Sequence, residues 1–541
     1  MPNQGKGSEK KFLGGVAVLL PATLFAKILG LFYKIPLVHT VGVTGMAYFL
    51  SAYHVYSLLF VLSASGLPTA LSLLISKAVA SGEGRSAGRI LRLSLLFFLL
   101  LGGAGALVLL CGADFLAARL SMPEAAPALR AIAPALVLSV VTGALRGWFQ
   151  GQHNMIPTAV SEVLEALGKL CFGLLFAGLA KGRGASLSEV AAAAIFGITA
   201  GVALSALWLL LATLLFPRGR EGGWCRIRRR QALSSLCRVA LPVTMGAVVM
   251  NLVSLIDTVL ISGRLQAGGM APEVANAMYS SYGNLAVPFY NLIPALLAPV
   301  TLALTPALSA AMAEHKREEA GRIFGSALRV GALVTLPAAL GLSVFARPLL
   351  LMLYRGEESA VSVAAPLLSI LCASMIPAVL ISLTGAALQA AGHTMVPFFS
   401  MLAGAAFKLA VEVILLGVPG VGIGGAPIST LCCNLMVLTV QVLALSRVMP
   451  PTAVLGREPL RALGAAVFAV GGGVFLYSLL EKYGGAPGWH MPVTLLLVML
   501  LYVLLALRWR AVQQEDIRSL PMGERLCLLL QKCKLLPEVK K

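Results

Sequence analysis

The sequence predicts an all-α membrane protein with about fourteen transmembrane helices. Hydrophobic residues make up 58% of the 541 positions and charged residues only 12%, whereas about a quarter of a soluble domain is charged. The mean hydropathy is +0.90, and apolar stretches long enough to cross a bilayer core of roughly 30 Å recur along the chain. The net charge of +20 does not indicate nucleic-acid binding, because basic loops set the orientation of membrane proteins.

Fourteen apolar stretches account for most of the chain. Proline lies inside several of them, and residues 278–313 alone hold four. Because proline removes a backbone donor and kinks a helix, we expect bent helices there. The predicted spans are residues 12–38, 46–75, 94–111, 128–149, 158–179, 190–216, 239–262, 278–313, 323–345, 361–389, 395–416, 423–445, 462–480 and 491–507.

The distribution of Lys and Arg predicts the orientation of these spans. If the N-terminus lies in the cytosol, most of the 42 Lys and Arg fall in segments that also face the cytosol. Cytosolic loops of membrane proteins carry such an excess of basic residues. We therefore expect both termini in the cytosol. The first apolar stretch is longer than that of a signal peptide, so we expect an uncleaved helix.

An internal repeat predicts the domain organisation. Residues His153 to Pro157 reappear as His393 to Pro397, and Ala87 to Ile90 reappear as Ala320 to Ile323. An even number of predicted spans separates the matched points, so both repeats have the same orientation in the membrane. We expect two parallel lobes of six helices each, two further helices and a cytosolic amphipathic tail. These parts would occupy residues 1–222, 223–450, 451–510 and 511–541.

The first stretch, residues 12–38, carries two lysines, Lys27 and Lys34. They are seven residues apart, so they lie on one side of the helix. A lysine at the centre of a lone membrane helix costs about 2.5–3.5 kcal/mol, and a helix that keeps two needs a polar surface to face. We expect this side to line a water-filled, cationic cavity. Lys34 could instead extend toward the outer headgroups.

Acidic and basic residues recur together in two other spans. Glu162, Glu165 and Lys169 share one face of the span 158–179, and Lys408 and Glu412 are four residues apart in the span 395–416. Two interpretations stay open. These residues line a polar cavity or couple transport to an ion, or they are neutralised pairs that hold helices together.

Four other residues are candidates for the cavity. Arg146 and Arg264 lie at span ends, where a basic residue contacts an anionic substrate or only anchors the helix at the membrane surface. Asn251 and Asp257 lie in the span 239–262 and are candidates for cavity lining or ion coupling. His54 is expected to be a hydrogen-bonded packing residue.

No pattern in the sequence indicates a cofactor, a metal or a reaction. The nine cysteines show no CxxC or Cys/His spacing typical of metal ligands. A GxxxxGK[ST] nucleotide-binding motif is absent from the sequence. The predicted outer loops are too short to build the active site of a membrane-embedded transferase. We therefore expect no enzyme, no cofactor and no metal, and the energy source stays open.

Several motifs together resemble a known family of transporters. They resemble the stage V sporulation protein B branch of the multidrug/oligosaccharidyl-lipid/polysaccharide (MOP) exporter superfamily, over roughly the whole membrane region. The order of the motifs and the internal repeat match as well. The motifs are Lys27 to Pro36, Ala64 to Pro68 with Ser72 and Lys77, Asn251 to Asp257, Tyr282-Gly283, Pro288 and Pro306 to Ser309.

This resemblance implies a flippase in a bacterial cytoplasmic membrane. Such proteins move undecaprenyl-pyrophosphate-linked sugars from the inner to the outer leaflet, and the MurJ-like branch moves lipid II, the peptidoglycan precursor. Their basic cluster between two lobes would correspond to Lys27 and Lys34, although relatives more often have Arg there, which binds phosphate with a bidentate fork. A cation site of some relatives would fall on Asp257. The implied partners are the lipid-linked oligosaccharide, the bilayer, a coupling cation or membrane potential, and cell-wall or spore-cortex synthesis enzymes.

Three alternatives remain open from the sequence. An exporter of another lipid-linked polysaccharide unit would have nearly the same pattern. A drug/cation antiporter of the MATE type should favour acidic residues where this chain has Lys27 and Lys34. A non-transporting scaffold for cell-wall enzymes would use the tail, but it would leave the lysines inside the membrane unexplained.

Overall fold

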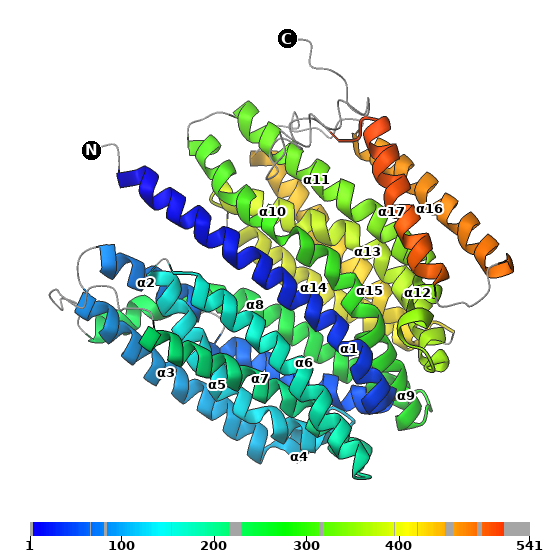
Figure 1. Cartoon of the computed structure of the whole chain (residues 1–541), viewed down its shortest axis with the longest axis horizontal. Coiled ribbons are helices and arrows are strands. Elements are labelled where there is room, and N and C mark those ends of the chain that lie inside the picture. The colour runs from blue at the N-terminus through cyan, green and yellow to red at the C-terminus, as the bar shows by residue number, and fades with distance from the viewer. Residues whose placement is uncertain are drawn as a thin grey trace. The chain divides into compact units, whose positions relative to one another are not determined.

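The computed structural model confirms the all-α prediction. In the part of the chain that it describes, residues form helices and connecting turns and no strand (Figure 1). The described residues are 4–64, 67–80, 84–152, 154–215, 229–313, 317–393, 395–418, 420–448, 458–483 and 489–512. The predicted tail, residues 511–541, therefore lies almost entirely outside them, as does most of the basic linker 217–238.

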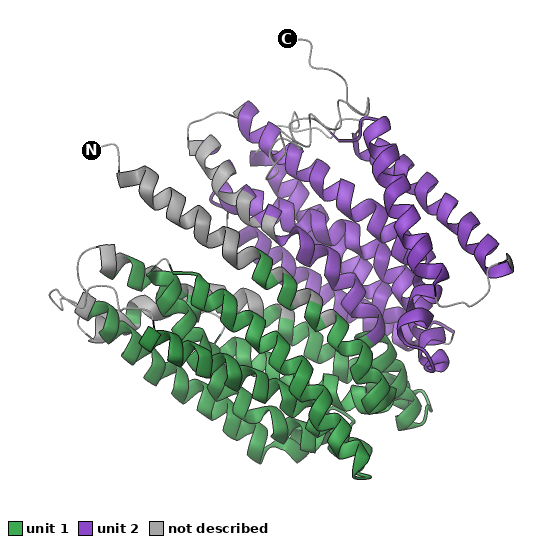
Figure 2. Cartoon of the chain, viewed as in Figure 1, with its two compact units in different colours: residues 1–284 green, residues 285–541 purple. Residues whose placement is uncertain are grey.

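Contacts between Cα atoms divide the chain into two compact units, residues 1–284 and residues 285–541 (Figure 2). The first unit contains the first six predicted spans and also α8 (Arg229–Ala267) and α9 (Pro272–Ser280). Helix α8 belongs there because it packs against α1, α2 and α3. Packing thus groups the helices differently from the sequence repeat, and the lobes predicted from that repeat stay a prediction.

The first unit is a bundle of long helices with several shorter ones between them. Besides α8 and α9, its helices are α1 (Gln4–Ala64), α2 (Leu67–Ala80), α3 (Gly84–Cys111), α4 (Ala113–Arg119), η1 (Pro123–Ala125), α5 (Ala126–Gly151), α6 (Ile156–Gly182) and α7 (Leu187–Leu215).

The second unit is built in the same way. A π-helical turn, η2 (Ser281–Ala286), joins it to α9. Its helices are α10 (Val287–Ala313), α11 (Arg317–Val344), α12 (Ala346–Leu353), α13 (Glu358–Ala390), α14 (Met395–Leu416), η3 (Gly422–Gly424), α15 (Gly425–Val448), α16 (Glu458–Tyr483) and α17 (His490–Arg508).

Eleven helices among the described residues are long and apolar enough to cross a membrane. This confirms a protein that passes through the membrane many times, while the number fourteen stays a prediction. The first two predicted spans share α1, which is broken by a non-helical residue at Gly42 (φ 79°, ψ 162°). Glycine tolerates a positive φ that side-chain-bearing residues avoid. The second predicted span also continues in α2, after the end of α1 at Ala64.

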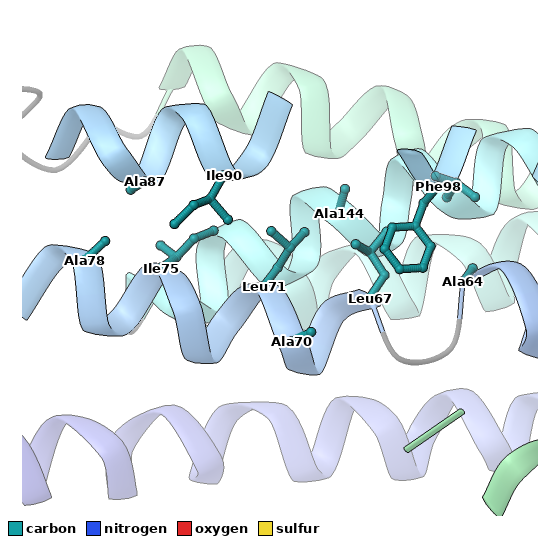
Figure 3. Close-up of a cluster of buried hydrophobic side chains, with 11 residues drawn as sticks. Ala64, Leu67, Ala70, Leu71, Ile75, Ala78, Ala87, Ile90, Phe98 and Ala144 are labelled. Atoms are coloured by element: carbon teal, nitrogen blue, oxygen red, sulfur yellow. The ribbon is translucent and has the colours of Figure 1, made fainter. Parts of the chain in front are cut away.

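The short helix α2 packs against α3 and α5 through an apolar cluster (Figure 3). Leu67, Leu71 and Ile75 are spaced by four, so they lie on one face of α2, and all three are fully buried. Small residues of α5 let this face approach. A methyl group at Gly147 would lie 2.8 Å from the Pro68 carbonyl oxygen, and glycine therefore permits the contact. This packing fixes the end of α5 beside Arg146.

Helices α6 and α7 approach each other even more closely. A Cβ at Gly168 of α6 would lie 2.7 Å from the Cα of Gly201 in α7. A Cβ at Gly201 would in turn lie 2.7 Å from the backbone nitrogen of Lys169 and 2.8 Å from the carbonyl oxygen of Glu165. Glycine pairs allow such close contact between membrane helices. They place α7 directly against the turn of α6 that carries Glu165 and Lys169.

Candidate functional site

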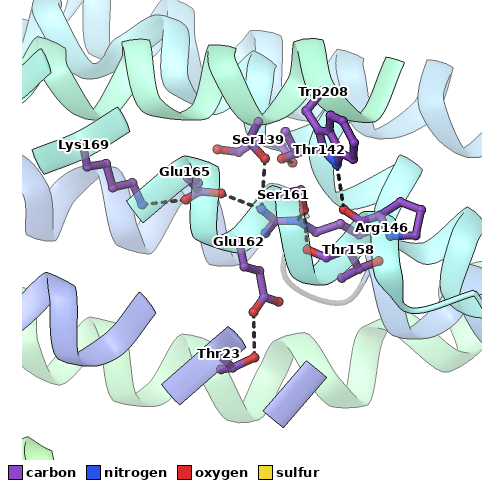
Figure 4. A network of polar contacts seen from close by, with 12 residues as sticks. Thr23, Ser139, Thr142, Arg146, Thr158, Ser161, Glu162, Glu165, Lys169 and Trp208 are labelled. Carbon is purple, nitrogen blue, oxygen red and sulfur yellow. Dashed lines mark hydrogen bonds and ion pairs between the residues drawn. The ribbon is translucent and has the colours of Figure 1, made fainter. Parts of the chain in front are cut away.

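The first polar cluster lies among α5, α6 and α7 and is centred on Arg146 (Figure 4). Arg146 Nε donates to Ser161 Oγ at 2.9 Å, and Nη2 donates to Glu165 Oε2 at 2.7 Å and Ser205 Oγ at 3.1 Å. Lys169 Nζ donates to Glu165 Oε1 at 2.6 Å. Each oxygen of the Glu165 carboxylate therefore meets a different cation.

These charges are largely removed from solvent. The side chains of Arg146, Glu165 and Lys169 are 19%, 18% and 31% exposed. Removing one partner of a buried ion pair leaves an uncompensated charge and strongly destabilises a protein. The arrangement supports the interpretation of Glu165 and Lys169 as a neutralised pair, and it gives Arg146 a structural partner.

Glu162 joins this cluster to α1. Its Oε2 accepts a hydrogen bond from Thr23 Oγ1 at 2.6 Å (Figure 4). Glu162 comes three residues before Glu165, so both lie on the same side of α6. With Arg146 and Lys169, the cluster contains two acids and two bases. Its ionised form is neutral overall.

A second polar cluster forms around Lys34 in the first unit. Lys34 Nζ donates to the side-chain oxygen of Asn284 at 3.3 Å. Asn284 is fully buried, and its amide nitrogen donates to the Met46 carbonyl oxygen at 3.1 Å and to Ser280 Oγ at 3.2 Å. Among the described side chains, no carboxylate lies within ion-pair distance of Lys34.

Asn284 lies in the π-helical turn η2. In a π-helix each amide bonds one residue further back than in an α-helix, and such turns occur often at functional sites. The turn places a buried amide beside a lysine that stands 250 positions earlier in the chain. No spacing rule could have identified this contact.

His54, farther along α1, contacts α8 and α9. Its Nδ1 lies 2.8 Å from Thr258 Oγ1 and 3.1 Å from the Tyr279 hydroxyl. Three residues on, Ser57 donates to Asn251 Oδ1 at 2.5 Å. Asp257 precedes Thr258 and, like Lys34, interacts electrostatically with His54. Of the predicted residues, Lys34, Asn251 and Asp257 are thus brought to one region of the first unit.

The second unit holds the other predicted acid–base pair. In α14, Lys408 Nζ donates to Glu412 Oε2 at 3.0 Å, and the two side chains are 6% and 0% exposed. A lysine and a glutamate four residues apart lie on one helix face, so they can neutralise each other.

Two predicted substrate contacts are not placed in either cluster. Arg264 is exposed in the last turn of α8, where a cation interacts favourably with the helix dipole. Lys27 belongs to α1, but its side chain is not among those that the structure describes. Among the described side chains, no group of three or more His, Cys, Asp or Glu could hold a metal ion.

Sequence reasoning did not predict the uncharged partners in the two clusters or around His54 and Asn251. These are Thr23, Ser57, Ser161, Ser205, Thr258, Tyr279 and Asn284. Most are hydroxyl residues, and Ser and Thr can hydrogen-bond to the backbone of their own helix without any other partner. Their presence alone therefore carries no functional signal.

Comparison with known sequences relates most of the chain to one family. The sequence profile described as "Polysaccharide biosynthesis protein" matches residues 12–312, and a second profile, MatE, matches residues 242–414. Three relatives come from Bacillus subtilis strain 168. Stage V sporulation protein B is 25% identical over 96% of this chain and all of its own length. The membrane protein YabM is 29% identical over 77% of this chain and 76% of its own.

The third relative is the lipid II flippase MurJ, which is 30% identical over 30% of this chain and 32% of its own length. A solved structure of a lipid II flippase MurJ in an inward closed conformation has the same fold, with a TM-score of 0.67, 15% identity and coverage of 90% of this chain and 97% of that one.

An inward-facing MATE-family multidrug transporter also shares the fold. Its TM-score is 0.65 at 18% identity, with coverage of 80% of this chain and 98% of that one. Because the first profile spans more than half of the sequence, this chain belongs to the polysaccharide biosynthesis protein family, in the flippase branch of the MOP exporter superfamily.

Proposed function

We propose that this protein is a flippase that moves an undecaprenyl-pyrophosphate-linked sugar, specifically lipid II, from the inner to the outer leaflet of a bacterial cytoplasmic membrane. Membership of the polysaccharide biosynthesis protein family supports a lipid-linked glycan as the substrate. The relative that is named a lipid II flippase supports the specific choice.

The observation that carries the proposal is the environment of Lys34. Arg146 and Lys169 share the carboxylate of Glu165, and Lys408 is paired with Glu412. Lys34 instead faces a neutral amide oxygen. Its charge is therefore available to an anionic ligand, whereas Arg146, Lys169 and Lys408 are each paired with a carboxylate.

A pyrophosphate headgroup needs such a group. Moving an isolated charge from water into hydrocarbon costs on the order of tens of kcal/mol by Born solvation, so the headgroup cannot cross unaided. Hydrogen bonds from an ammonium to phosphate oxygens are short and about twice as strong as neutral ones. Lys34 would bind the headgroup while the polyprenyl tail stays in the lipid.

Other predicted residues have subordinate roles in this proposal. Lys27 and Arg264 would add positive charge along the path, and Asp257 with Asn251 would bind a coupling cation. Arg146, Glu162, Glu165, Lys169, Lys408 and Glu412 would hold helices in place. The protein would act as a transporter rather than an enzyme, with both termini in the cytosol and a membrane potential or an ion gradient as energy source.

Two other substrates are possible outcomes of the same experiment. An exporter of a different lipid-linked polysaccharide unit would use Lys34 in the same way, because the pyrophosphate is common to both. A MATE-type drug/cation antiporter would not, since a lysine without a carboxylate partner repels cationic drugs.

The test is transport of fluorescent lipid II between leaflets of proteoliposomes that contain the purified protein. Wild type should equilibrate the lipid. Lys34→Met, which keeps the length of the side chain without its charge, should slow transport about tenfold or more, the effect of losing one charge-assisted hydrogen bond. Lys34→Arg should retain most of the activity, because it keeps the charge.

Lys482→Met is the matched control, because Lys482 is exposed in the last turn of α16. It should transport like wild type. Wild-type rates in Lys34→Met, with the same amount of folded protein, would refute the role of Lys34. Transport of another undecaprenyl-pyrophosphate-linked glycan but not of lipid II would correct the substrate. Transport of cationic drugs alone would refute the proposal as a whole.

A further inference from the structure

His54 is held in place through one of its two ring nitrogens. Nδ1 lies 2.8 Å from Thr258 Oγ1 and 3.1 Å from the Tyr279 hydroxyl, which themselves lie 2.8 Å apart. Thr258 is fully buried and Tyr279 is 2% exposed. Thr258 and Tyr279 come from two different helices, α8 and α9, so the ring on α1 is positioned by two neighbouring elements.

The hydrogen bonds around Nδ1 are satisfied when this nitrogen carries the proton. Thr258 Oγ1 lies 3.0 Å from the Ser254 carbonyl oxygen, to which it donates. It can then accept from the Tyr279 hydroxyl and from Nδ1–H. This arrangement, in which all three contacts are hydrogen bonds, is the Nδ1–H tautomer.

This tautomer leaves Nε2 with a lone pair. Both hydrogen-bonding contacts of the ring involve Nδ1, and none of the described residues lies within hydrogen-bonding distance of Nε2. The ring is only half-buried. A half-buried imidazole that is anchored at Nδ1 presents Nε2 to a ligand in a fixed direction.

The charged surroundings of the ring are also defined. The charged groups Lys34 on α1 and Asp257 on α8 act on it with opposite signs. The titratable groups beside it are Tyr279 on α9 and Tyr53 on α1, whose ring centroid lies 6.5 Å away.

Lys34 has the amide of Asn284 as its partner. Tyr279, which contacts His54, directly precedes Ser280, which is hydrogen-bonded to the Asn284 partner of Lys34. Lys34 and His54 therefore face the same short stretch of chain, where one ligand could contact both.

We propose that His54 is a second contact for the phosphate group of the substrate. The neutral ring takes up one proton at Nε2 from water when the substrate binds, and the resulting Nε2–H donates to a phosphate oxygen. The proton returns to water when the substrate leaves. This inference depends on the proposed function, because it needs a substrate with a phosphate.

Two substitutions of His54 test the roles of its two ring nitrogens separately. H54N places its amide nitrogen where Nδ1 lies, so it keeps the contacts with Thr258 and Tyr279 but loses Nε2. H54Q reaches the position of Nε2 with a donor that does not titrate. H393N is the matched control, because His393 is exposed between α13 and α14.

The experiment measures binding of undecaprenyl pyrophosphate, which has no sugar, to the purified full-length protein at about pH 6 and about pH 8, on either side of the ordinary charge change of histidine. The substrate's own phosphates titrate as well, so each variant is compared with wild type at each pH. We expect H54N to bind about tenfold more weakly than wild type at the lower pH and to differ less at the higher pH. H393N should match wild type at both.

Several results would overturn the proposal. One is H54N binding like wild type at both values of pH. Another is that H54N binds lipid II more weakly than wild type does but binds undecaprenyl pyrophosphate equally well, because the ring would then contact the sugar. If H54N does not fold, H54Q decides, and a pH dependence in H54Q equal to that of wild type would exclude proton uptake at His54. Failure of wild type to bind either lipid would instead refute the proposed function.

Discussion

At the scale of single residues, the charges inside this protein fall into two groups according to their partners. Arg146, Lys169 and Lys408 each meet a carboxylate, and Lys34 meets an amide. An ion pair inside a membrane protein pays for its own desolvation only if it is well paired. Paired charges therefore fit a structural role, whereas a cation beside an amide can still bind an anion.

Sequence spacing identified some of these partners and not others. Glu165–Lys169 and Lys408–Glu412 are four residues apart on one helix, so their pairing could be predicted. Arg146 and Glu165 are nineteen residues apart on two helices, and no helical period connects them. For this reason Arg146 looked like a substrate contact or a membrane anchor in the sequence, and its carboxylate partner became visible only in the structure.

The pair Lys408–Glu412 provides a prediction about stability. Lys408→Met should lower the melting temperature of the purified protein, because removing one partner of a buried pair costs about 3–5 kcal/mol. The double substitution Lys408→Met/Glu412→Leu should recover most of this loss, since no charge remains buried. Thermal unfolding in detergent measures both.

The same variants show whether the Lys408–Glu412 pair has only a structural role or also a role in transport. If the pair is only structural, the double variant should move lipid II at nearly the wild-type rate. A double variant that is as stable as wild type but does not transport would contradict this, and it would assign the pair to the transport pathway. Lys482→Met again controls for the loss of an exposed lysine.

At the scale of helices, α1 connects the residues that carry the proposals. It bears Lys34 before the break at Gly42 and His54 after it. A residue with φ of 79° at this position is readily accommodated only if it is glycine. The sequence predicted two separate spans here. It could not show that the connection would be a single kinked helix, because residues 39–45 contain two glycines and four β-branched residues, which disfavour helix, and the surrounding packing overrides that preference.

The approach of α6 to α7 gives a second prediction. At Gly201→Ala the new methyl group would lie 2.7 Å from the backbone nitrogen of Lys169 and 2.8 Å from the carbonyl oxygen of Glu165. Backbone atoms cannot move aside as a flexible side chain can, so we expect a loss of about 1–3 kcal/mol in stability. Transport should fall as well, because the same turn carries the partners of Arg146.

Gly178→Ala is the control for this substitution. Gly178 lies in α6 itself, and a Cβ there would meet nothing within 4 Å. Alanine is the better helix former by about 1 kcal/mol in water, so this variant should be at least as stable as wild type. Equal melting temperatures for Gly201→Ala and Gly178→Ala would show that the helices can separate without loss.

At the scale of the whole molecule, hydropathy predicted the helices well and their grouping less well. Every predicted span falls mainly on helix in the described part of the chain. A long apolar run must form a helix in lipid, because each backbone polar group needs an internal partner. Which helices pack together depends on side-chain shape, as at Gly147 and Gly201. Hydropathy does not contain that information, and α8 therefore joins the first unit unexpectedly.

The orientation of the whole chain is the remaining prediction. The basic segments should face the cytosol, because Lys and Arg are retained on that side during insertion. Single cysteines, introduced into a variant without the nine native ones, can test this with a membrane-impermeant maleimide applied to intact cells.

A cysteine at Gly184, between α6 and α7, should react from outside. A cysteine at Gly392, between α13 and α14, should react only after the membrane is opened. Both positions are exposed turns in which glycine has a positive φ, so accessibility on the correct side should be similar. If the cysteine at residue 392 also reacts in intact cells, an even number of spans, rather than the predicted five, separates the two positions, and the predicted fourteen-span topology would be wrong.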